Sequence, residues 1–324
     1  MEPSTLAARR PGTETRPAAP DRPGGKRTRV RRVSVVLPAC DEEAALPGVL
    51  ARLAAALAPL REEGYRFETI VVDDGSRDRT AELAEGAGAR VLHHSRRLGN
   101  GAAVKRGARE ADGELLVFLD ADGQHPPEEI PRLLQALESN DLAVGARRRP
   151  GGSWTRRLGN GALNLFASCV TGRRIPDLTS GFRAARAEAF RRFLYLLPNE
   201  FSYPTTSTLA FLRAGLAVAF VPVEDGRDAG TSHVRPLQDG AKFFLILVKV
   251  ATIFSPLRVF VPSAAAIAAG GFANYLYTYW TQGRFTNMSV LMFTLAAIMF
   301  ALGLVSEQIA ALRFERSEAD DERR

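Results

Sequence analysis

The sequence predicts an α/β protein whose mostly parallel sheet is followed by two membrane-spanning helices. Between residues 33 and 145, short apolar runs of strand length alternate with stretches of helical periodicity, which is the pattern of strands joined by crossover helices. Such crossovers are right-handed. Near the C-terminus, two segments without charged residues are each long enough to cross a bilayer.

Five strands are expected in the first part of the chain. The run Leu-Leu-Val-Phe-Leu is apolar throughout, as in a central strand covered on both faces. The first strand ends at Pro38, which cannot donate a hydrogen bond to a neighbouring strand. The expected strands are 33–37, 69–72, 90–93, 115–119 and 141–145.

Three helices are expected between these strands. Residues 42–60 are rich in Ala and Leu at helical spacing. Thr80 can cap a short helix after the second strand. A third helix follows Gly99-Asn100-Gly101 and ends near Glu110. Its two glycines could approach a phosphate or simply form a turn.

The basic charge of the chain is concentrated at its beginning. The whole sequence carries a net charge of +7, of which residues 1–32 supply +6. Residues 1–30 are predicted to be a disordered basic tail, because they show no apolar periodicity. The remaining chain is nearly neutral and has no basic stripe interleaved with aromatic residues, which argues against nucleic acid as a partner.

Cysteine and histidine residues predict neither a disulfide framework nor a metal site. Only Cys40 and Cys169 are present, which fits a reducing compartment. His93 and His94 are adjacent in an expected strand, so their side chains should point to opposite faces and not share a metal.

Polar side chains follow several expected strands at their carboxyl ends. Asp120 and Asp122 follow the central strand, and Glu42, Asp74 and Arg147 follow three others. Ligands of open α/β sheets bind beyond these ends of the strands. Two hard oxygen donors suit Mg²⁺ or Mn²⁺ carrying a diphosphate. The alternative for an isolated Asp-x-Asp is a solvated turn.

Four motifs resemble, in their order, those of a known enzyme family. They are Val-Leu-Pro-Ala-Cys-Asp-Glu-Glu (36–43), Val-Asp-Asp-Gly-Ser (72–76), Asp-Ala-Asp-Gly-Gln-His-Pro-Pro (120–127) and Asp-Leu-Thr-Ser-Gly-Phe (177–182). In this order they resemble the inverting GT-A glycosyltransferases of family 2. The most similar branch contains dolichyl-phosphate mannose synthase and the bacterial polyprenyl-phosphate glycosyltransferases. The resemblance implies a Rossmann-like GT-A domain over residues 31–237.

The resemblance also implies roles for individual residues. Mg²⁺ or Mn²⁺ and the diphosphate would be held by Asp120, Asp122 and Gln124. The residues expected to bind the nucleotide sugar are Pro38, Ala39, Glu42, Asp73, Asp74, Ala121, Gln124, Arg147, Ser232 and His233. Those expected to take part in catalysis are Asp120, Asp122, Arg147, Asp177 and Arg227. In this set Asp177 would act as a base only if the acceptor were a hydroxyl.

The chain departs from the family pattern at several positions. Cys40-Asp41 stands where the family often has Tyr-Asn, Asn100 where a Lys is frequent, and His233 where Lys is usual. Residues 201–208 lack a carboxylate that mannose synthases carry nearby. The sugar is therefore not identified by the motifs. A phosphate contact through His233 would titrate, because imidazole is only partly charged near neutrality.

The composition of the C-terminal part predicts a membrane hairpin. Lys and Arg are more frequent before the first span and after the second than in the loop between them, which holds only Arg284. This bias places the catalytic domain and both termini in the cytoplasm and the protein in the cell membrane. The expected segments are a juxtamembrane amphipathic helix (238–257), two transmembrane helices (258–281 and 286–312) and a charged tail (313–324).

Three further features of this region concern how the chain meets the membrane and how the hairpin packs. Residues 241–254 could lie in the headgroup plane or pack on the catalytic domain. Tyr275, Tyr277, Tyr279 and Trp280 should form an aromatic belt at the far interface. Small residues around Gly270-Gly271 would let the hairpin pack closely on itself or on a second copy in a homo-oligomer.

Together these features predict a membrane-anchored enzyme. The resemblance implies metal-dependent transfer of a sugar from a nucleotide diphosphate to a polyprenyl phosphate, with inversion. One alternative is a polysaccharide or glycolipid synthase with a hydroxyl acceptor, although no Gln-x-x-Arg-Trp follows the catalytic region. Another is a non-catalytic module that binds lipid-linked sugars. The partners expected are therefore a nucleotide sugar, a polyprenyl phosphate and the bilayer.

Overall fold

The computed structural model of the chain describes residues 31–147, 161, 163–165, 167, 168, 171–200, 203–224 and 256–322, the last ten of these by their backbone only. Several predictions fall outside the described residues. These are the basic tail 1–30, the amphipathic segment 238–255, Cys169, and the three late residues Arg227, Ser232 and His233.

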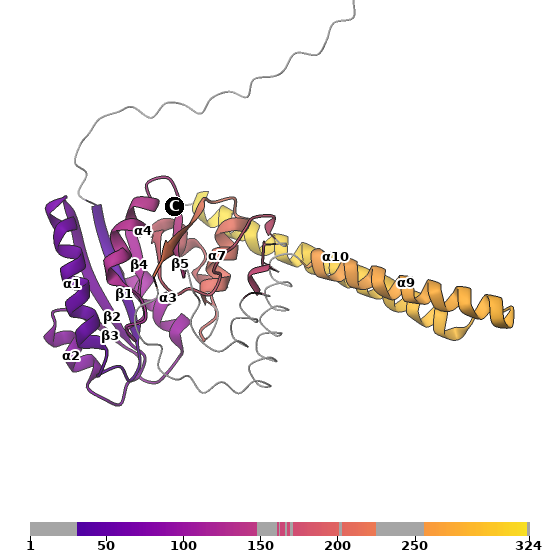
Figure 1. Ribbon diagram of the computed structural model, residues 1–324, viewed down its shortest axis with the longest axis horizontal. Helices are drawn as coiled ribbons and strands as arrows, with labels where there is room; N and C mark the ends of the chain where they lie inside the picture. The colour runs from indigo at the N-terminus through magenta and orange to yellow at the C-terminus, as the bar shows by residue number, and fades with distance from the viewer. Residues whose placement is uncertain are drawn as a thin grey trace, which may run out of the picture.

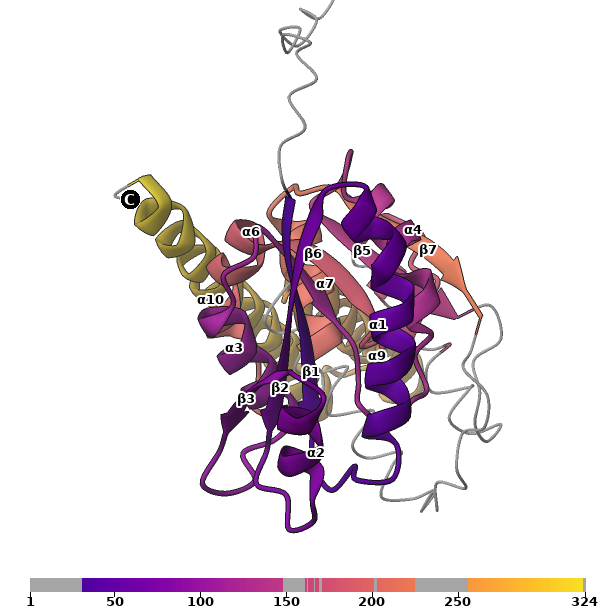
Figure 2. The ribbon, with the colours of Figure 1, turned by 90° about the vertical axis from the view of Figure 1, so that its left-hand side faces the viewer.

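A seven-stranded sheet organises the first domain, with the strand order β3-β2-β1-β4-β6-β5-β7. Neighbouring strands are parallel except at β6, which runs antiparallel to both β4 and β5. The predicted α/β class with a mostly parallel sheet is thus confirmed (Figures 1 and 2). The strands are β1 (Arg31–Ala39), β2 (Tyr65–Asp73), β3 (Arg90–His93), β4 (Leu115–Phe118), β5 (Leu142–Arg147), β6 (Arg183–Arg186) and β7 (Val218–Val223).

Helices cover both faces of this sheet, and the alternation of side chains along β4 shows how. Leu116 and Phe118 pack on one face, under α3, α6 and α7, whereas Leu115 and Val117 pack on the other, under α1, α2 and α4. Figure 2 shows α1 and α4 on one side of the sheet and α3 and α6 on the other. The helices are α1 (Leu46–Glu62), α2 (Thr80–Gly86), α3 (Asn100–Glu110), α4 (Ile130–Ala136), α6 (Ala187–Arg192) and α7 (Tyr203–Arg213).

Two predictions about helix starts are wrong. The first helix begins at Leu46 and not at residue 42, since residues 43–45 form a turn before it. The backbone N–H of Glu42 donates to the hydroxyl of Thr80 at 2.8 Å. That hydroxyl therefore does not cap α2, which begins at Thr80 itself without a side-chain cap. A long-range contact between two loops replaces the expected local one.

The second domain is a hairpin of α9 (Leu257–Gln282) and α10 (Asn287–Glu322), which projects from the sheet domain (Figure 1). Both helices are long and apolar enough to cross a membrane, and few of their residues are buried. A Cβ on Gly271 would lie 3.0 Å from the Cβ of Met292. The glycine therefore permits the close helix approach that small residues predict.

A fully buried arginine joins β6 to α7. The Arg183 guanidinium donates to the carbonyl of Pro204 at 2.9 Å and to the hydroxyls of Ser207 and Thr208 at 2.6 and 3.2 Å. It also donates to the carbonyl of Ser180. Arg183 has no exposed surface, so water cannot replace these donors.

We expect Arg183→Leu to lower the free energy of unfolding by about 3–5 kcal/mol, because four buried acceptors would lose their donors. Arg186→Leu is the matched control, since Arg186 lies on the same strand with 45% of its side chain exposed. Its effect should stay within about 1 kcal/mol. Urea unfolding of both variants in detergent measures the difference, and equal losses would contradict a special role for Arg183.

Candidate functional site

The carboxyl ends of β1, β2, β4 and β5 meet at one edge of the sheet and carry most of the predicted site residues. Because these strands lie in one sheet and run in the same direction, the loops at their carboxyl ends meet although they are far apart in sequence. Among the described residues, this edge holds Pro38, Ala39, Glu42, Asp73, Asp74, Asp120, Ala121, Asp122, Gln124 and Arg147. We call this set the carboxyl-end rim.

Asp120 leaves the buried strand β4 and is held from three sides. Its backbone N–H donates to Nδ1 of His125 at 3.2 Å, and the His125 ring stacks on Phe182 with centroids 5.6 Å apart. The side-chain amide of Asn100 lies 3.4 Å from Asp120 Oδ1. A Cβ on Gly181 would lie 2.7 Å from Asp120 Oδ2. The carboxylate therefore occupies space that only a glycine at position 181 leaves open.

Asp122 and Glu42 share the electrostatic environment of Asp120. Burial raises the pKa of Asp122, and the nearby Asp120 raises it further. Burial also raises the pKa of Glu42, with additional repulsion from Asp122 and Asp120. The backbone N–H of Gln124 donates to Asp122 Oδ1 at 2.9 Å, which fixes the turn between them.

This donor set fits a divalent cation that brings further ligands with it. Carboxylate oxygens are the preferred ligands of Mg²⁺ and Mn²⁺, and a cation would relieve their mutual repulsion. Within the described part of the chain, no three His, Cys, Asp or Glu side chains form a metal cage. A metal held by Asp120 and Asp122 would therefore complete its shell with water or diphosphate oxygens.

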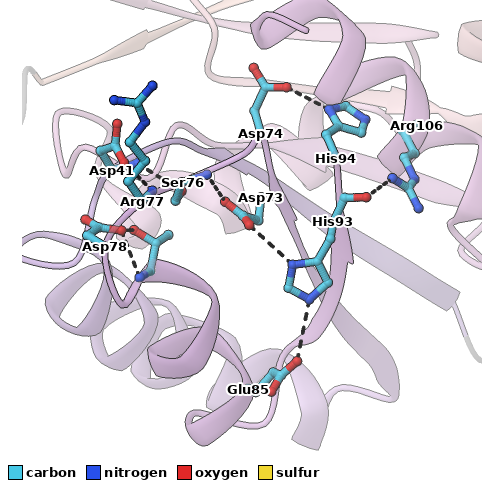
Figure 3. A network of polar contacts seen from close by, with 11 residues as sticks. Asp41, Asp73, Asp74, Ser76, Arg77, Asp78, Glu85, His93, His94 and Arg106 are labelled. Atoms are coloured by element: carbon cyan, nitrogen blue, oxygen red, sulfur yellow. Dashed lines mark hydrogen bonds and ion pairs between the residues drawn. The ribbon is translucent and has the colours of Figure 1, made fainter. Parts of the chain in front are cut away.

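Asp73 and Asp74 belong to the rim and shape the loops next to them (Figure 3). Asp74 accepts hydrogen bonds from the backbone N–H groups of Leu98 and Gly99, at 2.9 and 2.7 Å, and from Nδ1 of His94 at 2.7 Å. These bonds set the entry into α3 and so the position of Asn100. Nucleotide contacts of Asp73 and Asp74 stay a prediction.

The neighbouring histidines turn to different partners, although β3 ends at His93 and does not include His94. His93 lies against Asp73 and is half exposed, whereas His94 lies against Asp74 with 6% of its side chain exposed. Figure 3 shows His93 also directed toward Glu85. Because the two rings point to different acids, they do not converge on one site.

The loops after β1 and β2 are joined by reciprocal hydrogen bonds. Asp41 adopts a left-handed backbone conformation, with φ of 58°, and its carboxylate accepts the N–H of Arg77 at 2.8 Å. Its own N–H donates to the hydroxyl of Ser76 at 3.0 Å. The segment around Cys40 is thus fixed by the second motif, although the family pattern differs there.

Arg147 and Asp177 form a bidentate pair. Nε and Nη2 of Arg147 donate to the two carboxylate oxygens of Asp177 at 2.8 and 3.1 Å. Burial alone would raise the pKa of Asp177, but the hydrogen bonds from Arg147 outweigh it and hold the pKa below its usual range. A carboxylate with a lowered pKa is a weak general base, so this pairing disfavours proton abstraction by Asp177.

The glycines at the start of α3 serve packing. A Cβ on Gly101 would lie 2.1 Å from the carbonyl oxygen of Pro198, and one on Gly99 would lie 2.6 Å from that of Asn199. The backbone N–H of Ala102 donates to the Asn199 carbonyl at 2.8 Å. Close packing against the backbone of residues 198 and 199 therefore explains both glycines, and a phosphate contact is not needed to account for them.

Three residues that contribute to the site were not predicted from the sequence. His125, Gly181 and Tyr203 surround Asp120 or support its neighbours, and the Tyr203 hydroxyl donates to the Gly181 carbonyl at 3.1 Å. Burial raises the pKa of Tyr203, which keeps it a donor. His125 and Gly181 lie inside two of the four motifs, and this position is the signal that could have indicated these two residues.

Comparison with known proteins agrees with both parts of the chain. Residues 34–194 match the glycosyl transferase family 2 domain, and residues 255–312 match the GtrB C-terminal hairpin. An undecaprenyl-phosphate 4-deoxy-4-formamido-L-arabinose transferase of Proteus mirabilis is 31% identical, over 88% of this chain and 90% of its own length. An undecaprenyl-phosphate mannosyltransferase of Micrococcus luteus is 33% identical, over 59% of this chain and 82% of its own.

A solved structure with the same type of catalytic domain contains a metal. Glucosyl-3-phosphoglycerate synthase of Mycobacterium tuberculosis, in complex with Mn²⁺ and UDP-glucose, superimposes with a TM-score of 0.55 at 26% identity. The match covers 68% of this chain and 78% of that protein.

We expect Gly181→Ala to lower kcat/KM by about 10- to 100-fold, because the added methyl group would push the Asp120 carboxylate aside and small misplacements are costly in catalysis. Gly48→Ala on α1 is the control, since a Cβ there meets nothing within 4 Å. Steady-state kinetics beside thermal melting separate the two effects. Unchanged kinetics in a well-folded Gly181→Ala would contradict the proposed constraint on Asp120.

Proposed function

Because the chain belongs to glycosyl transferase family 2, an inverting family, we propose that it transfers a sugar from a nucleotide diphosphate to a polyprenyl phosphate. Its membership confirms the resemblance that the four motifs indicate. The observation that carries the proposal is similarity along 88% of the chain to a transferase named for undecaprenyl phosphate. The family 2 match covers the carboxyl-end rim, and the hairpin match covers the apolar helices.

The donor would lie along the carboxyl-end rim. Pro38, Ala39, Glu42, Asp73 and Asp74 would contact the base and ribose, and Ala121 and Gln124 the sugar diphosphate. Mg²⁺ or Mn²⁺ held by Asp120, Asp122 and Gln124 would offset the charge that develops on the leaving diphosphate. The complex of the mycobacterial synthase with Mn²⁺ and UDP-glucose supports a divalent metal at such a site.

The acceptor would be the phosphate of a membrane lipid. One of its anionic oxygens forms a bond to the anomeric carbon while the bond from that carbon to the diphosphate breaks, and the diphosphate leaves with the electron pair. Such a nucleophile needs positioning and no deprotonation, which agrees with the low pKa of Asp177. Arg147, Arg227, Ser232 and His233 would hold the phosphates.

The hairpin would place this reaction at a membrane. The apolar helices and the hairpin match make the chain a membrane protein. We assign residues 31–237 to the catalytic domain, 258–281 and 286–312 to the two spans, and the catalytic domain and both termini to the cytoplasm. Exposed aromatic side chains at the far end of α9, with Trp280 85% exposed, support an interface there.

The alternatives are less well supported. A hydroxyl acceptor would need a base, and Asp177 is occupied by Arg147. A non-catalytic binding module would not need the closely spaced and mutually repelling carboxylates of Glu42, Asp120 and Asp122.

We expect Asp122→Asn to lower turnover by at least about 100-fold, the scale on which a single preorganised electrostatic contact acts. Asp120→Asn should be similarly severe, and EDTA should abolish activity until Mg²⁺ or Mn²⁺ is restored. The exposed Asp112→Asn is the control. Turnover is measured at limiting metal with melting as a check, and near-normal activity of Asp122→Asn at low metal would place the metal elsewhere.

We expect purified protein to form a new glycolipid when a panel of nucleotide sugars is mixed with undecaprenyl phosphate. Mass spectrometry of the lipid fraction identifies the sugar and the linkage to phosphate. Reactions with 3-phosphoglycerate and with a glycolipid that has a free hydroxyl run in parallel. Transfer to either of these, and none to undecaprenyl phosphate, would refute the proposed acceptor.

A further inference from the structure

Glu307 of α10 contacts two other helices at once. Its Oε1 lies 3.3 Å from Nη2 of Arg213, the last residue of α7 in the catalytic domain. Its Oε2 accepts the backbone N–H of Leu257, the first residue of α9, at 3.4 Å. Both charged side chains are about a quarter exposed. One carboxylate therefore joins the catalytic domain to both arms of the hairpin.

The position of Glu307 along α10 is also informative. The segment from Asn287 to Ser306 contains no charged residue, and its helical length is about 30 Å, the thickness of the hydrocarbon core. Glu307 thus follows the charge-free part of the second span (286–312) and lies in its last turns, on the side of the catalytic domain. A carboxylate at this depth is costly without partners. The backbone N–H of Leu257 at the start of α9 and the guanidinium of Arg213 are its partners.

The two hairpin helices touch directly beside this carboxylate. Gly303 lies one turn before Glu307, and a Cβ there would lie 2.6 Å from the Cβ of Phe260. It would also lie 3.5 Å from a side-chain carbon of Leu257. This close packing fixes the start of α9 relative to Glu307, so the ion pair with Arg213 is made by a rigid unit.

Helix α7 connects that junction to the candidate site. At its first residue, the Tyr203 hydroxyl bonds the carbonyl of Gly181, which lies against Asp120. Its first turns bond the buried Arg183 of β6. Eleven helical residues then span about 15 Å to Arg213. Figure 1 shows α7 on the side of the sheet domain next to α10.

We propose that α7 is a strut between the carboxyl-end rim and the membrane hairpin, and that the Arg213–Glu307 pair is its membrane-side attachment. The pair holds the rim at a set height and orientation over the bilayer, so that the phosphate of a long-chain lipid reaches the donor. Glu307 and Arg213 are positioning residues, and neither touches a substrate. This inference rests on the proposed lipid-phosphate acceptor.

The test uses charge reversal in the full-length protein. Glu307→Arg and Arg213→Glu are assayed in vesicles of phosphatidylethanolamine and phosphatidylglycerol that contain undecaprenyl phosphate, with the donor that the wild type uses. We expect each to raise the KM for the long-chain lipid about tenfold, as expected when one partner of a partly buried pair is reversed. The donor KM should stay within twofold, and so should kcat/KM for a short-chain, detergent-soluble polyprenyl phosphate.

The double exchange Arg213→Glu/Glu307→Arg should recover most of the lost lipid KM, because the opposite charges face each other again. Glu307→Gln should be milder than Glu307→Arg, since its carbonyl oxygen still accepts the Leu257 N–H. The control is the Arg31–Glu138 pair, which has the same 3.3 Å separation at the start of β1, away from the rim. Its reversal should leave the lipid KM unchanged.

Hydrogen exchange measures the attachment without any substrate. In Glu307→Arg, amides in residues 205–213 and 257–261 should exchange faster than in the wild type, and the double exchange should restore their protection. Unchanged exchange, equal losses with long and short lipids, or a double variant no better than the single ones would each overturn the proposal. Wild-type failure to glycosylate undecaprenyl phosphate would instead refute the acceptor, while the exchange result would still report on the strut.

Discussion

Carboxylates that repel one another lie at the ends of buried strands, and the other contacts of the site hold them there. Glu42, Asp120 and Asp122 share one partly buried region, and burial together with their proximity raises the pKa of Glu42 and Asp122. Such an arrangement persists only if the backbone holds it. The strand β4, the His125 contact and the tight approach of Gly181 do so, and the resulting negative potential favours a cation that brings a diphosphate.

The support for this rim passes through the one strand that breaks the parallel pattern. Strand β6 lies between β4 and β5, and its Arg183 anchors the first turns of α7 through donors that no water can replace. Helix α7 then ends at Arg213, against Glu307 of the hairpin. Catalytic geometry and membrane attachment thus depend on the same helix. This explains how a catalytic domain of a widespread type can act on an acceptor that cannot leave the bilayer.

Much of the fold and the functional class could be predicted because their signals are local. The apolar run 115–119 and the acids that follow it are adjacent in sequence, and so are the other expected strands and the polar residues that follow them. The charge-free spans are equally local, since bilayer thickness sets the length of apolar sequence required. Strands β6 and β7 were not predicted. Strand β6 consists of two alanines between arginines, carries no strand pattern and is held by pairing with β4 and β5.

The α/β class, the acids at the strand ends and the apolar hairpin follow from the sequence alone, because each depends on neighbouring residues and on solvent. Tertiary structure alone decided that Thr80 accepts from Glu42 instead of capping its helix, and that Arg147 engages Asp177. It also decided that Gly181 confines Asp120 and that Arg213 meets a glutamate 94 residues away. These contacts join groups whose separation in sequence carries no periodic signal. They form only when packing of the whole chain brings the groups within hydrogen-bonding distance.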